Sequence, residues 1–325
     1  MKKGIVAIDL GGTTIKCALL SSLGELIEKW EIPTNKSDGG GHIVQDIALT
    51  VEEALHRHRW DKQDVLGIGV GAPGAVDKEK GLVLGAVNLG WKGDLPLQIE
   101  LEKATGLRVE IDNDANCAAL GEKWKGAGDG EPNLVCVTLG TGVGGGVIAN
   151  NRIVHGAGGA AGEIGHMTMI PMGGAPCNCG KTGCLETIAS ATGIVRTAQE
   201  KRAKAVKVGS LSPFVMDLSE HDMTSQLVFQ YAQQQDDVAL EVVQEVSEVL
   251  GLALSYIANT LNPTRIVIGG GVSKAGNTLM YPVKTAFQKF AYPNVARTTD
   301  LVFAQLGNDA GVYGAGYLLL ENSGA

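Results

Sequence analysis

Three cysteines and one histidine lie close together near the middle of this chain, in a pattern that can hold a metal ion. Cys177, Cys179 and Cys184 follow the spacing C-x-C-x4-C, and His166 lies eleven residues before the first of them. A C-x-C pair is awkward to join by a disulfide, and three is an odd number of cysteines. Three thiolates and one imidazole complete the tetrahedral shell of a structural Zn²⁺ ion with no open position. The segment therefore predicts a structural zinc site.

Two glutamates flank this cluster, and their chemistry differs from that of the predicted metal ligands. Glu163 and Glu186 add carboxylates that a four-ligand shell does not need. Because carboxylates only accept hydrogen bonds, both are suited to bind the hydroxyl groups of a sugar. If one ring nitrogen of His166 binds the metal, its other N–H is fixed in direction and can donate to a substrate oxygen. The region is expected to combine a structural metal with a sugar-binding surface.

A second polar cluster lies where a predicted strand meets a predicted helix, and it reads Asp112-Asn113-Asp114-Ala115-Asn116. Asx residues are favoured at helix N-caps, so one of these positions is expected to serve only as a cap. Four polar residues exceed that need, and ligands bind at the carboxyl ends of strands in open α/β sheets. A carboxylate at this junction could take the proton from a substrate hydroxyl group.

Three glycine-rich turns each follow an apolar strand, at residues 11–13, 140–146 and 269–271. Phosphate groups need converging backbone N–H donors, and glycine lets the main chain come close to them. The first two turns share the same order of strand, turn and strand. Asp9 precedes the first turn, where it could cap the turn or hold Mg²⁺ beside nucleotide phosphates.

Gly140, Gly142 and Gly145 also match the dinucleotide-binding pattern G-x-G-x-x-G. That pattern requires a helix directly after the glycines. Here the apolar residues 147–149 are followed by Asn150-Asn151 and a further apolar pair, which predicts a β-hairpin. A dinucleotide site is therefore not expected.

The chain alternates apolar runs, which predict strands, with segments of i, i+3/i+4 spacing, which predict helices. An α/β arrangement is therefore expected to position these clusters. The expected strands are 5–8, 15–20, 26–32, 65–70, 109–112, 134–138, 147–149 and 265–268. The expected helices are 44–55, 97–104, 114–124, 238–261 and 309–320. The glycine-rich segment 126–132 is expected to separate two halves.

The composition limits the class of protein further. The chain has 325 residues, with 27 Lys and Arg against 35 Asp and Glu, so its net charge is −8. Negative charge disfavours a nucleic-acid partner, which needs clustered basic residues. No apolar run reaches the roughly 18 residues that span a membrane, and the N-terminus lacks the apolar core of a signal peptide. We therefore expect a cytoplasmic protein with small-molecule ligands, no nucleic acid and no membrane.

These motifs resemble those of the ROK family of sugar kinases, within the actin/hexokinase/Hsp70 ATPase superfamily, and the resemblance runs nearly end to end. It rests on residues 9–16, 139–146, 162–166 and the zinc motif at 177–186, and residues 71–74, 88–91 and 112–116 are most similar to the bacterial glucokinases of the family. The resemblance implies a two-domain actin-like (ribonuclease H-like) ATPase fold of the α/β class with the active site in the interdomain cleft. Residues 1–117 plus 302–325 would form the small domain, and residues 118–301 the large domain with the zinc motif.

The resemblance also implies ATP-dependent phosphorylation of glucose at the 6-hydroxyl group, a reaction of glycolysis, with Mg²⁺ and structural Zn²⁺ as cofactors. Asp114 would be the general base. Glucose would be bound by Gly74, Asn88, Asn113, Asp114, Glu163, His166 and Glu186. ATP with its Mg²⁺ would be bound by Asp9, Gly11, Gly12, Thr13, Lys16, Gly140, Thr141 and Gly142, and its adenosine by Gly269, Gly270 and Gly271. A homodimer or a higher homo-oligomer is expected on the same ground.

Alternatives to this function remain open. The acceptor could be another hexose, such as N-acetylmannosamine or fructose, and the phosphoryl donor could be polyphosphate instead of ATP. A sugar-sensing ROK transcriptional repressor would share the sugar site and the zinc motif, but such repressors carry an N-terminal helix-turn-helix. The first strand here is expected to begin at about Gly4, which leaves no room for one, and the acidic charge disfavours DNA.

Overall fold

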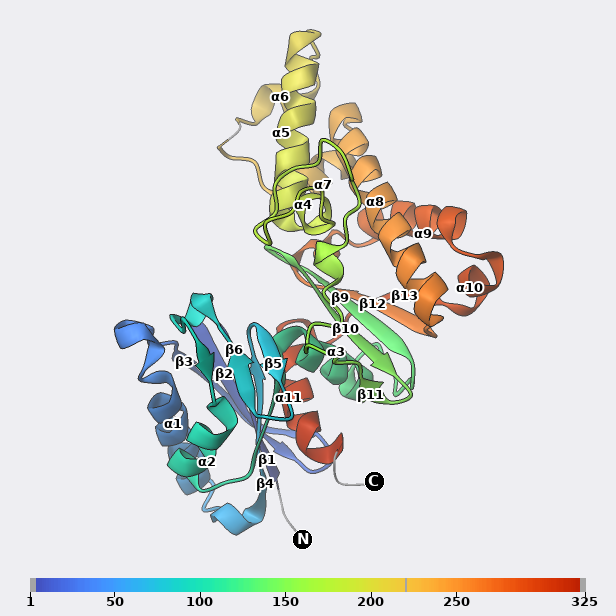
Figure 1. The fold of residues 1–325 in the computed structure, drawn as a ribbon. Coiled ribbons are helices and arrows are strands. Elements are labelled where there is room, and N and C mark those ends of the chain that lie inside the picture. Colours follow the sequence, from blue (N-terminus) through green and yellow to red (C-terminus); the bar gives the residue numbers. More distant parts are fainter. Residues whose placement is uncertain (1–3, 220, 322–325) are drawn as a thin grey trace. The chain divides into compact units, whose positions relative to one another are not determined.

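The computed structural model describes residues 4–219 and 221–321. The chain divides into two compact units. Unit 1 comprises Met1–Pro132, Gly146–Gly162 and Gln305–Ala325, and unit 2 comprises Asn133–Gly145 and Glu163–Ala304. Figure 1 labels most of the helices and strands of both units.

Unit 1 is built on a mixed five-stranded sheet of order β3-β2-β1-β4-β8. Its strands are β1 (Gly4–Leu10), β2 (Thr14–Ser21), β3 (Leu26–Pro33), β4 (Val65–Ala72) and β8 (Val109–Asn113). The first three strands are antiparallel neighbours, whereas β4 and β8 run parallel to β1. A small sheet of order β5-β6-β7 follows β4, with strands Ala75–Asp77, Leu82–Leu84 and Asp94–Leu95.

Helices cover both faces of the large sheet of unit 1, because successive side chains of a strand point to opposite faces. On β1, Val6 and Ile8 belong to a core that includes residues of α1 (Ile43–Arg57) and α2 (Leu97–Thr105). On the other face, Ile5 and Ala7 lie against α11 (Ala310–Glu321), which packs beside α3 (Asp114–Lys125). Figure 1 shows these two helix pairs on opposite sides of the strands.

Glycine allows α11 to approach its neighbours closely. A Cβ atom on Gly69 of β4 would lie 1.8 Å from the carbonyl oxygen of Ala315, and one on Gly314 would lie 1.6 Å from that of Cys117. Both distances are far inside van der Waals contact, so no larger residue fits without a shift of α11. This packing ties α3, and hence the residues at its N-terminus, to the face of the sheet.

The second sheet has the order β11-β10-β9-β12-β13. Its strands are β9 (Leu134–Leu139), β10 (Val143–Ala149), β11 (Arg152–Ile153), β12 (Arg265–Gly269) and β13 (Asp300–Phe303). β10 and β11 pair antiparallel, with Asn150 and Asn151 at φ 50° and 68°, as in a two-residue hairpin turn. The expected hairpin is thus confirmed, and no helix follows the glycines of β10.

The helices of unit 2 are α4 (Glu186–Ala189), α5 (Ala191–Lys207), α6 (Pro213–Asp217), α7 (Ser225–Gln233), α8 (Asp237–Leu261), α9 (Asn277–Phe290) and α10 (Pro293–Thr298). Short 3₁₀ turns occur at Ser37–Gly40, Lys62–Asp64, Val87–Leu89, Ile164–His166, Gly271–Ala275 and Gly307–Asp309. The helix predicted over residues 238–261 is α8, which Asp236 caps and which ends at Asn262 in the left-handed conformation. The helices α5, α7 and α9 carry no motif and are not among those expected from the sequence.

The expected domain boundaries differ from the units that the structure shows. A boundary after residue 117 would divide α3, which instead packs along its length on α11, so residues 118–132 cluster with unit 1. Residues 146–162 also cluster with unit 1, and residues 302–304 cluster with unit 2 because β13 pairs with β12. The glycine-rich segment 126–132 does lie at the end of the first stretch of unit 1.

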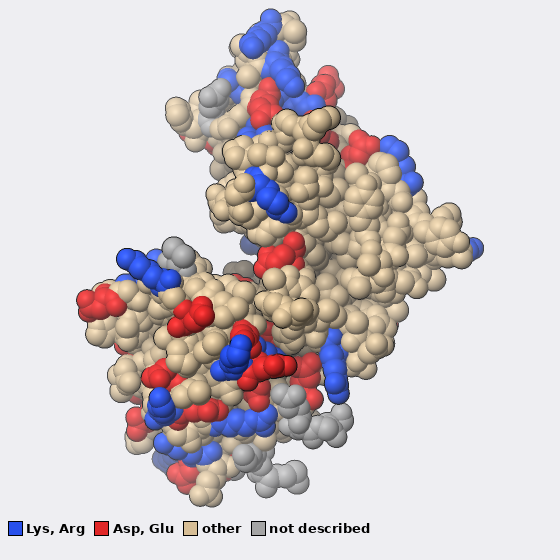
Figure 2. Space-filling model, viewed as in Figure 1, with Lys and Arg blue, Asp and Glu red and all other residues tan. Residues whose placement is uncertain are grey.

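Charged side chains are distributed differently over the two units. Figure 2 shows acidic and basic side chains intermixed on the visible face of unit 1, and basic ones gathered at the free end of α5 in unit 2.

Within the described part of the chain, none of the helices combines the length and apolarity that crossing a bilayer requires.

Candidate functional site

The carboxyl ends of three parallel strands bring the polar residues of unit 1 together. The strand register aligns Asp9 of β1 with Gly71 of β4, and Gly71 with Asp112 of β8. Asp9 and the cluster that begins at Asp112 therefore lie at the same edge of the sheet, although about a hundred residues separate them in the sequence. This edge is where ligands bind in open α/β sheets.

Asp114 is the first residue of α3 and is held by its neighbours. Asn113 is the N-cap, and its side-chain oxygen accepts from the backbone N–H groups of Ala115 and Asn116 at 2.9 and 3.1 Å. The amide nitrogen of Asn113 donates to Asp114 Oδ1 at 3.0 Å and to the carbonyl oxygen of Gly74 at 2.9 Å. Predicted site residues Gly74, Asn113 and Asp114 are thus in direct contact.

The environment of Asp114 makes its carboxylate basic. Burial raises the pKa of Asp114 to about 6, and the negative charge of Asp9 acts in the same direction. Hydrogen bonds from the N–H of Ala115 and the amide of Asn113 oppose this shift only partly. A carboxylate with a pKa near the working pH is suited to general-base catalysis, because it is both ionised and able to accept a proton.

Asp9 lies beside a cation and the first glycine-rich turn. Lys16 Nζ is 3.2 Å from Asp9 Oδ2, since the two residues pair across β1 and β2. Burial raises the pKa of Asp9, and the charge and hydrogen bond of Lys16 oppose the rise without cancelling it. The Gly11 N–H donates to the Thr14 carbonyl at 3.1 Å and thereby closes the turn.

The remaining predicted residues of unit 1 lie around this turn. A Cβ atom on Gly12 would lie 3.4 Å from the carbonyl oxygen of Asn88, so Asn88 lies beside the turn. Thr13 is exposed, and its carbonyl oxygen accepts from the backbone N–H of Thr34 at 2.9 Å. Unit 1 therefore groups its predicted phosphate-binding turn and its predicted sugar-binding residues along one edge of the sheet.

In unit 2 the four predicted metal ligands come together. One ligand atom from each of His166, Cys177, Cys179 and Cys184 lies within 4.8 Å of all the others. Cys177 Sγ is 3.5 Å from His166 Nδ1, and Cys179 Sγ is 3.7 Å from Cys184 Sγ. The tight turn from Cys177 to Lys181 closes with an N–H···O bond of 2.8 Å and brings the thiols of Cys177 and Cys179 to the same side.

The chemistry of this cluster fits a soft divalent cation. Burial and the adjacent thiols raise the pKa of Cys184 to about 12, whereas the backbone N–H of Lys181 lowers the pKa of Cys179. A bound cation would supply the positive charge that a buried thiolate needs. Three thiols with one imidazole, and no free position, match a structural Zn²⁺ shell.

The two flanking glutamates contact the predicted metal ligands directly. Glu163 Oε2 lies 3.7 Å from His166 Nε2, on the side of the ring that faces away from Cys177. Glu186 Oε1 lies 3.9 Å from Cys177 Sγ, and Glu186 Oε2 accepts from the Val143 N–H at 3.0 Å. The cluster therefore brings both carboxylates and the imidazole into one group; that Glu163, His166 and Glu186 bind a sugar stays a prediction.

Glu186 also joins this group to the second glycine-rich turn. A Cβ atom on Gly142 would lie 2.3 Å from Glu186 Oε2, so only glycine allows the carboxylate this position. The Gly140 N–H donates to the Gly142 carbonyl at 2.9 Å, and the Thr141 carbonyl accepts from Thr192 Oγ1 at 3.0 Å. The turn, the Glu186 carboxylate and the group of three cysteines with His166 form one continuous set of contacts in unit 2.

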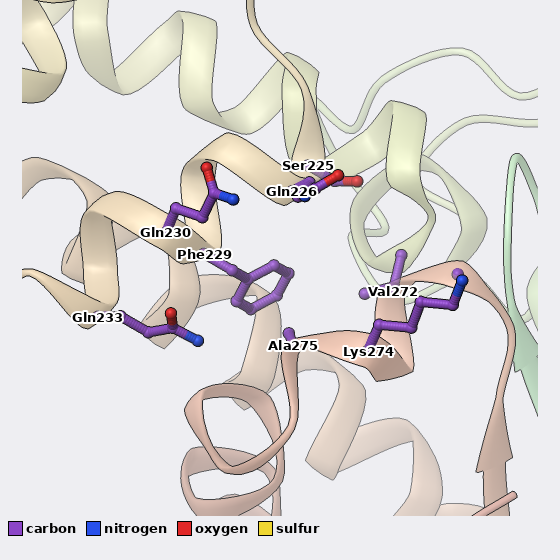
Figure 3. Close-up of a pocket in the computed structure, with 9 residues that line it drawn as sticks. Ser225, Gln226, Phe229, Gln230, Gln233, Val272, Lys274 and Ala275 are labelled. Atoms are coloured by element: carbon purple, nitrogen blue, oxygen red, sulfur yellow. The ribbon is translucent and has the colours of Figure 1, made fainter. Parts of the chain in front are cut away.

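The third glycine-rich turn borders a pocket of about 380 Å³ in unit 2. Gly270 has φ 84°, and a Cβ atom there would lie 2.4 Å from the Leu139 carbonyl, so this turn requires glycine. The pocket is lined by Ser225, Gln226, Phe229, Gln230, Gln233, Gly271, Val272, Lys274 and Ala275. Figure 3 shows Phe229 extending from α7 toward the Gly271–Ala275 turn, with glutamine amides around it.

Sequence reasoning missed two groups that this geometry shows. The residues of α7 that line the pocket belong to no recognised sequence motif. The amphipathic pattern of α7 was the one signal in the sequence that could have predicted this helix. His155 also went unnoticed, yet its Nε2 lies 2.7 Å from Asp112 Oδ2. No local spacing relates His155 to Asp112, so only the folded chain shows the pair.

Comparison with known proteins agrees with the motifs and with the fold. The model of the ROK family matches residues 5–322, and the chain therefore belongs to the ROK family. Its α/β architecture is the actin-like ATPase fold of the solved ROK sugar kinases.

Two glucokinases and one solved structure illustrate the similarity. The glucokinase of Halalkalibacterium halodurans is 53% identical over 317 residues, which cover 97% of this chain and 94% of the relative. The glucokinase of Thermotoga maritima is 35% identical and covers 99% of both chains. The structure of a ROK family glucokinase from Streptomyces griseus in complex with glucose and AMPPNP is 33% identical, with a TM-score of 0.75 over 97% of this chain and 98% of that one.

Proposed function

We propose that this chain transfers the γ-phosphoryl group of ATP to the 6-hydroxyl group of glucose. The observation that carries the proposal is Asp114, a carboxylate at the β8–α3 junction whose pKa is raised to about 6 by burial and by Asp9. The glucokinases among the relatives, one of them solved with glucose and a nucleotide analogue, support glucose and ATP as the substrates.

Phosphoryl transfer requires positioning and charge neutralisation more than covalent chemistry from the protein. In this proposal Asp114 orients the 6-hydroxyl group and accepts its proton as the oxygen attacks phosphorus. Asn113 and Gly74, which already contact each other, and Asn88 hold the sugar in unit 1. In unit 2, the carboxylates of Glu163 and Glu186 accept from sugar hydroxyl groups, and His166 donates through its Nε2.

The glycine-rich turns are proposed to bind the nucleotide. Backbone N–H groups at 11–13 and 140–142 would contact phosphate oxygens, and Lys16 adds positive charge. Mg²⁺ fits beside Asp9 because it prefers carboxylates while retaining several waters, and when bound it supplies charge that neutralises the phosphates. Adenosine would enter the pocket beside Gly269–Gly271, where Phe229 offers an apolar surface and the glutamines offer hydrogen bonds.

Zinc is proposed to serve the sugar site by holding residues in place. The ligand His166 also carries the Nε2 that faces Glu163, and the ligand Cys177 contacts Glu186. When bound, the ion fixes the tautomer of the imidazole and the path of the segment from His166 to Glu186.

A homodimer is proposed by analogy with the family. Unit 2 exposes Tyr256, Tyr281 and Tyr292 at 49%, 68% and 60%, and tyrosine is enriched in protein interfaces. Sedimentation velocity across a concentration series tests this assembly, and a monomer at micromolar concentration would contradict it.

The decisive experiment measures ADP formation with Mg-ATP over a panel of hexoses that includes glucose, fructose and N-acetylmannosamine. Glucose should give the highest kcat/KM, and the Asp114→Asn variant should lose turnover by ~10²–10⁴ while its glucose affinity stays within several-fold. A higher kcat/KM for another hexose would show that glucose is not the preferred acceptor. Activity with polyphosphate but not with ATP would show that ATP is not the phosphoryl donor. Shifted DNA in a gel assay without any kinase activity would support the repressor instead.

A further inference from the structure

Asp112 is a buried carboxylate two residues before Asp114, and its contacts exceed what capping α3 requires. The side chain is fully buried. Its Oδ1 accepts from the backbone N–H of Asn113 at 2.8 Å and from the side-chain amide of Asn116 at 2.9 Å. One oxygen of Asp112 thereby holds both the N-cap residue and the first turn of α3, between which Asp114 lies.

The second oxygen of Asp112 is held by groups from elsewhere in unit 1. His155 Nε2 lies 2.7 Å from Asp112 Oδ2 and must be the donor, since an ionised carboxylate only accepts. Lys78 Nζ lies 3.7 Å from the same oxygen and 3.5 Å from Glu321 Oε2. Burial raises the pKa of Asp112, but His155, Asn116 and Lys78 more than offset it, so the carboxyl group stays charged.

His155 is itself fixed by the segment that it begins. Its carbonyl oxygen accepts from the backbone N–H of Ala161 at 3.0 Å. Gly159 within this segment has φ 70°, and a Cβ atom there would lie 2.6 Å from the Val76 carbonyl, so the segment packs tightly against β5. The imidazole is therefore an anchored support for Asp112, with about a quarter of its side chain exposed.

We propose that Asp112, held by His155, is a positioning residue for the base Asp114, an inference that rests on the proposed function. The chain of contacts is continuous. His155 binds Asp112, Asp112 binds the N–H of Asn113, and Asn113 donates to Asp114 Oδ1. A shift in Asp112 moves the start of α3, and a displacement of about 1 Å at a reacting group can cost on the order of 10²-fold in rate.

The test compares three replacements by steady-state kinetics with glucose and Mg-ATP. His155→Phe keeps an aromatic ring but removes the donor, and it should lower kcat by roughly 10–100-fold with KM for glucose changed less than about threefold. His155→Gln retains an N–H donor and should recover most of that loss. His58→Phe is the matched control, because His58 Nε2 lies at the same 2.7 Å from a carboxylate oxygen, that of Glu28, in a partly exposed pair of unit 1, and it should leave kcat unchanged.

A double-mutant cycle with Asp114→Asn separates positioning from general structural damage. If His155 acts through the base, His155→Phe should change the residual rate of Asp114→Asn by less than about twofold, measured with radiolabelled ATP. Asp112→Asn, which keeps the shape and one acceptor oxygen, should follow the same non-additive pattern and provides the test should His155→Phe not fold.

Three outcomes would overturn the inference while leaving the proposed function intact. They are an equal loss of kcat in both backgrounds, a loss confined to KM, and an unchanged kcat in the variants of His155 and Asp112. The proposed function fails separately if Asp114→Asn alone retains near-wild-type turnover, since this measurement involves neither His155 nor Asp112.

Discussion

The raised pKa of Asp114 predicts an acid limb in the pH dependence of the reaction. Burial raises this pKa from 3.8 to about 6, with Asp9 adding to the shift. A general base must be ionised to accept a proton, so activity is present above the folded-state pKa and is lost as pH falls through it. The kcat/KM for glucose reports this pKa in the enzyme that is free of glucose.

The size of the effect follows from the two pKa values. With a pKa of about 6, the ionised fraction of Asp114 falls from about 90% at pH 7 to about 10% at pH 5, so kcat/KM should fall about tenfold. With the ordinary pKa of 3.8, the same change of pH would lower the ionised fraction by less than about a tenth. The two cases are readily distinguished.

The assay quenches the reaction with acid at saturating Mg-ATP and separates ADP by chromatography, which avoids coupling enzymes that are themselves sensitive to pH. Asp114→Asn provides the control, and its residual rate should be flat between pH 5 and 7. A parent enzyme whose kcat/KM stays constant over this range would refute the assignment of a basic, buried Asp114. The same acid limb in Asp114→Asn would show that the titrating group belongs to the nucleotide or to another residue.

Further predictions concern stability, metal and backbone. Asp114→Asn should stabilise the protein at pH 8 by up to about 3 kcal/mol, because a raised pKa means that the ionised carboxylate is disfavoured in the folded state. The gain should shrink as pH falls through the folded-state pKa and be nearly gone at about pH 3, as read from urea unfolding at both pH values. Freshly purified, chelator-free protein should contain one zinc per chain by elemental analysis. Cys179→Ala should lose this metal and, by calorimetry, its glucose binding as well. Glucose affinity that is retained without metal would contradict the role proposed for the ion. Gly142→Ala should lower kcat/KM at least about tenfold by displacing Glu186, whereas Gly93→Ala, whose Cβ would meet nothing within 4 Å, should be neutral. Equal activity of the two alanine variants would show that the position of Glu186 does not matter.

Features that depend on local spacing were predictable from the sequence. The cluster of three cysteines and one histidine spans residues 166–184 and closes through turns within that segment, so residue types and spacing were sufficient to predict that these side chains lie together. The hairpins around residues 11–13 and at Asn150-Asn151 follow from apolar runs and turn residues in the same way. The helix α8 follows from its apolar period, with Asp236 as its cap and Asn262-Pro263 at its end.

Helices without a motif were predictable in principle but were missed. α5, α7 and α9 are amphipathic, and α9 contains Pro282, which argues against a helix when the sequence is read alone. The expected boundary after residue 117 differs from the structure because α3 packs on α11, a contact between segments far apart along the chain that no local pattern indicates. That packing depends on Gly314, whose missing side chain lets the two helices approach.

By itself the sequence determined which side chains are available, and their types and spacing predicted a metal site at the thiols and imidazole, phosphate binding at the glycine turns, and sugar binding at the carboxylates. Only the tertiary structure decided how basic Asp114 is, because that depends on its burial and on Asp9 across two strand pairings. It also decided that His155 supports Asp112 and that α7 faces the turn after β12. The physical reason is that sequence patterns record which residues are neighbours along the chain, whereas burial, charge and contact depend on strand register and helix packing between distant segments.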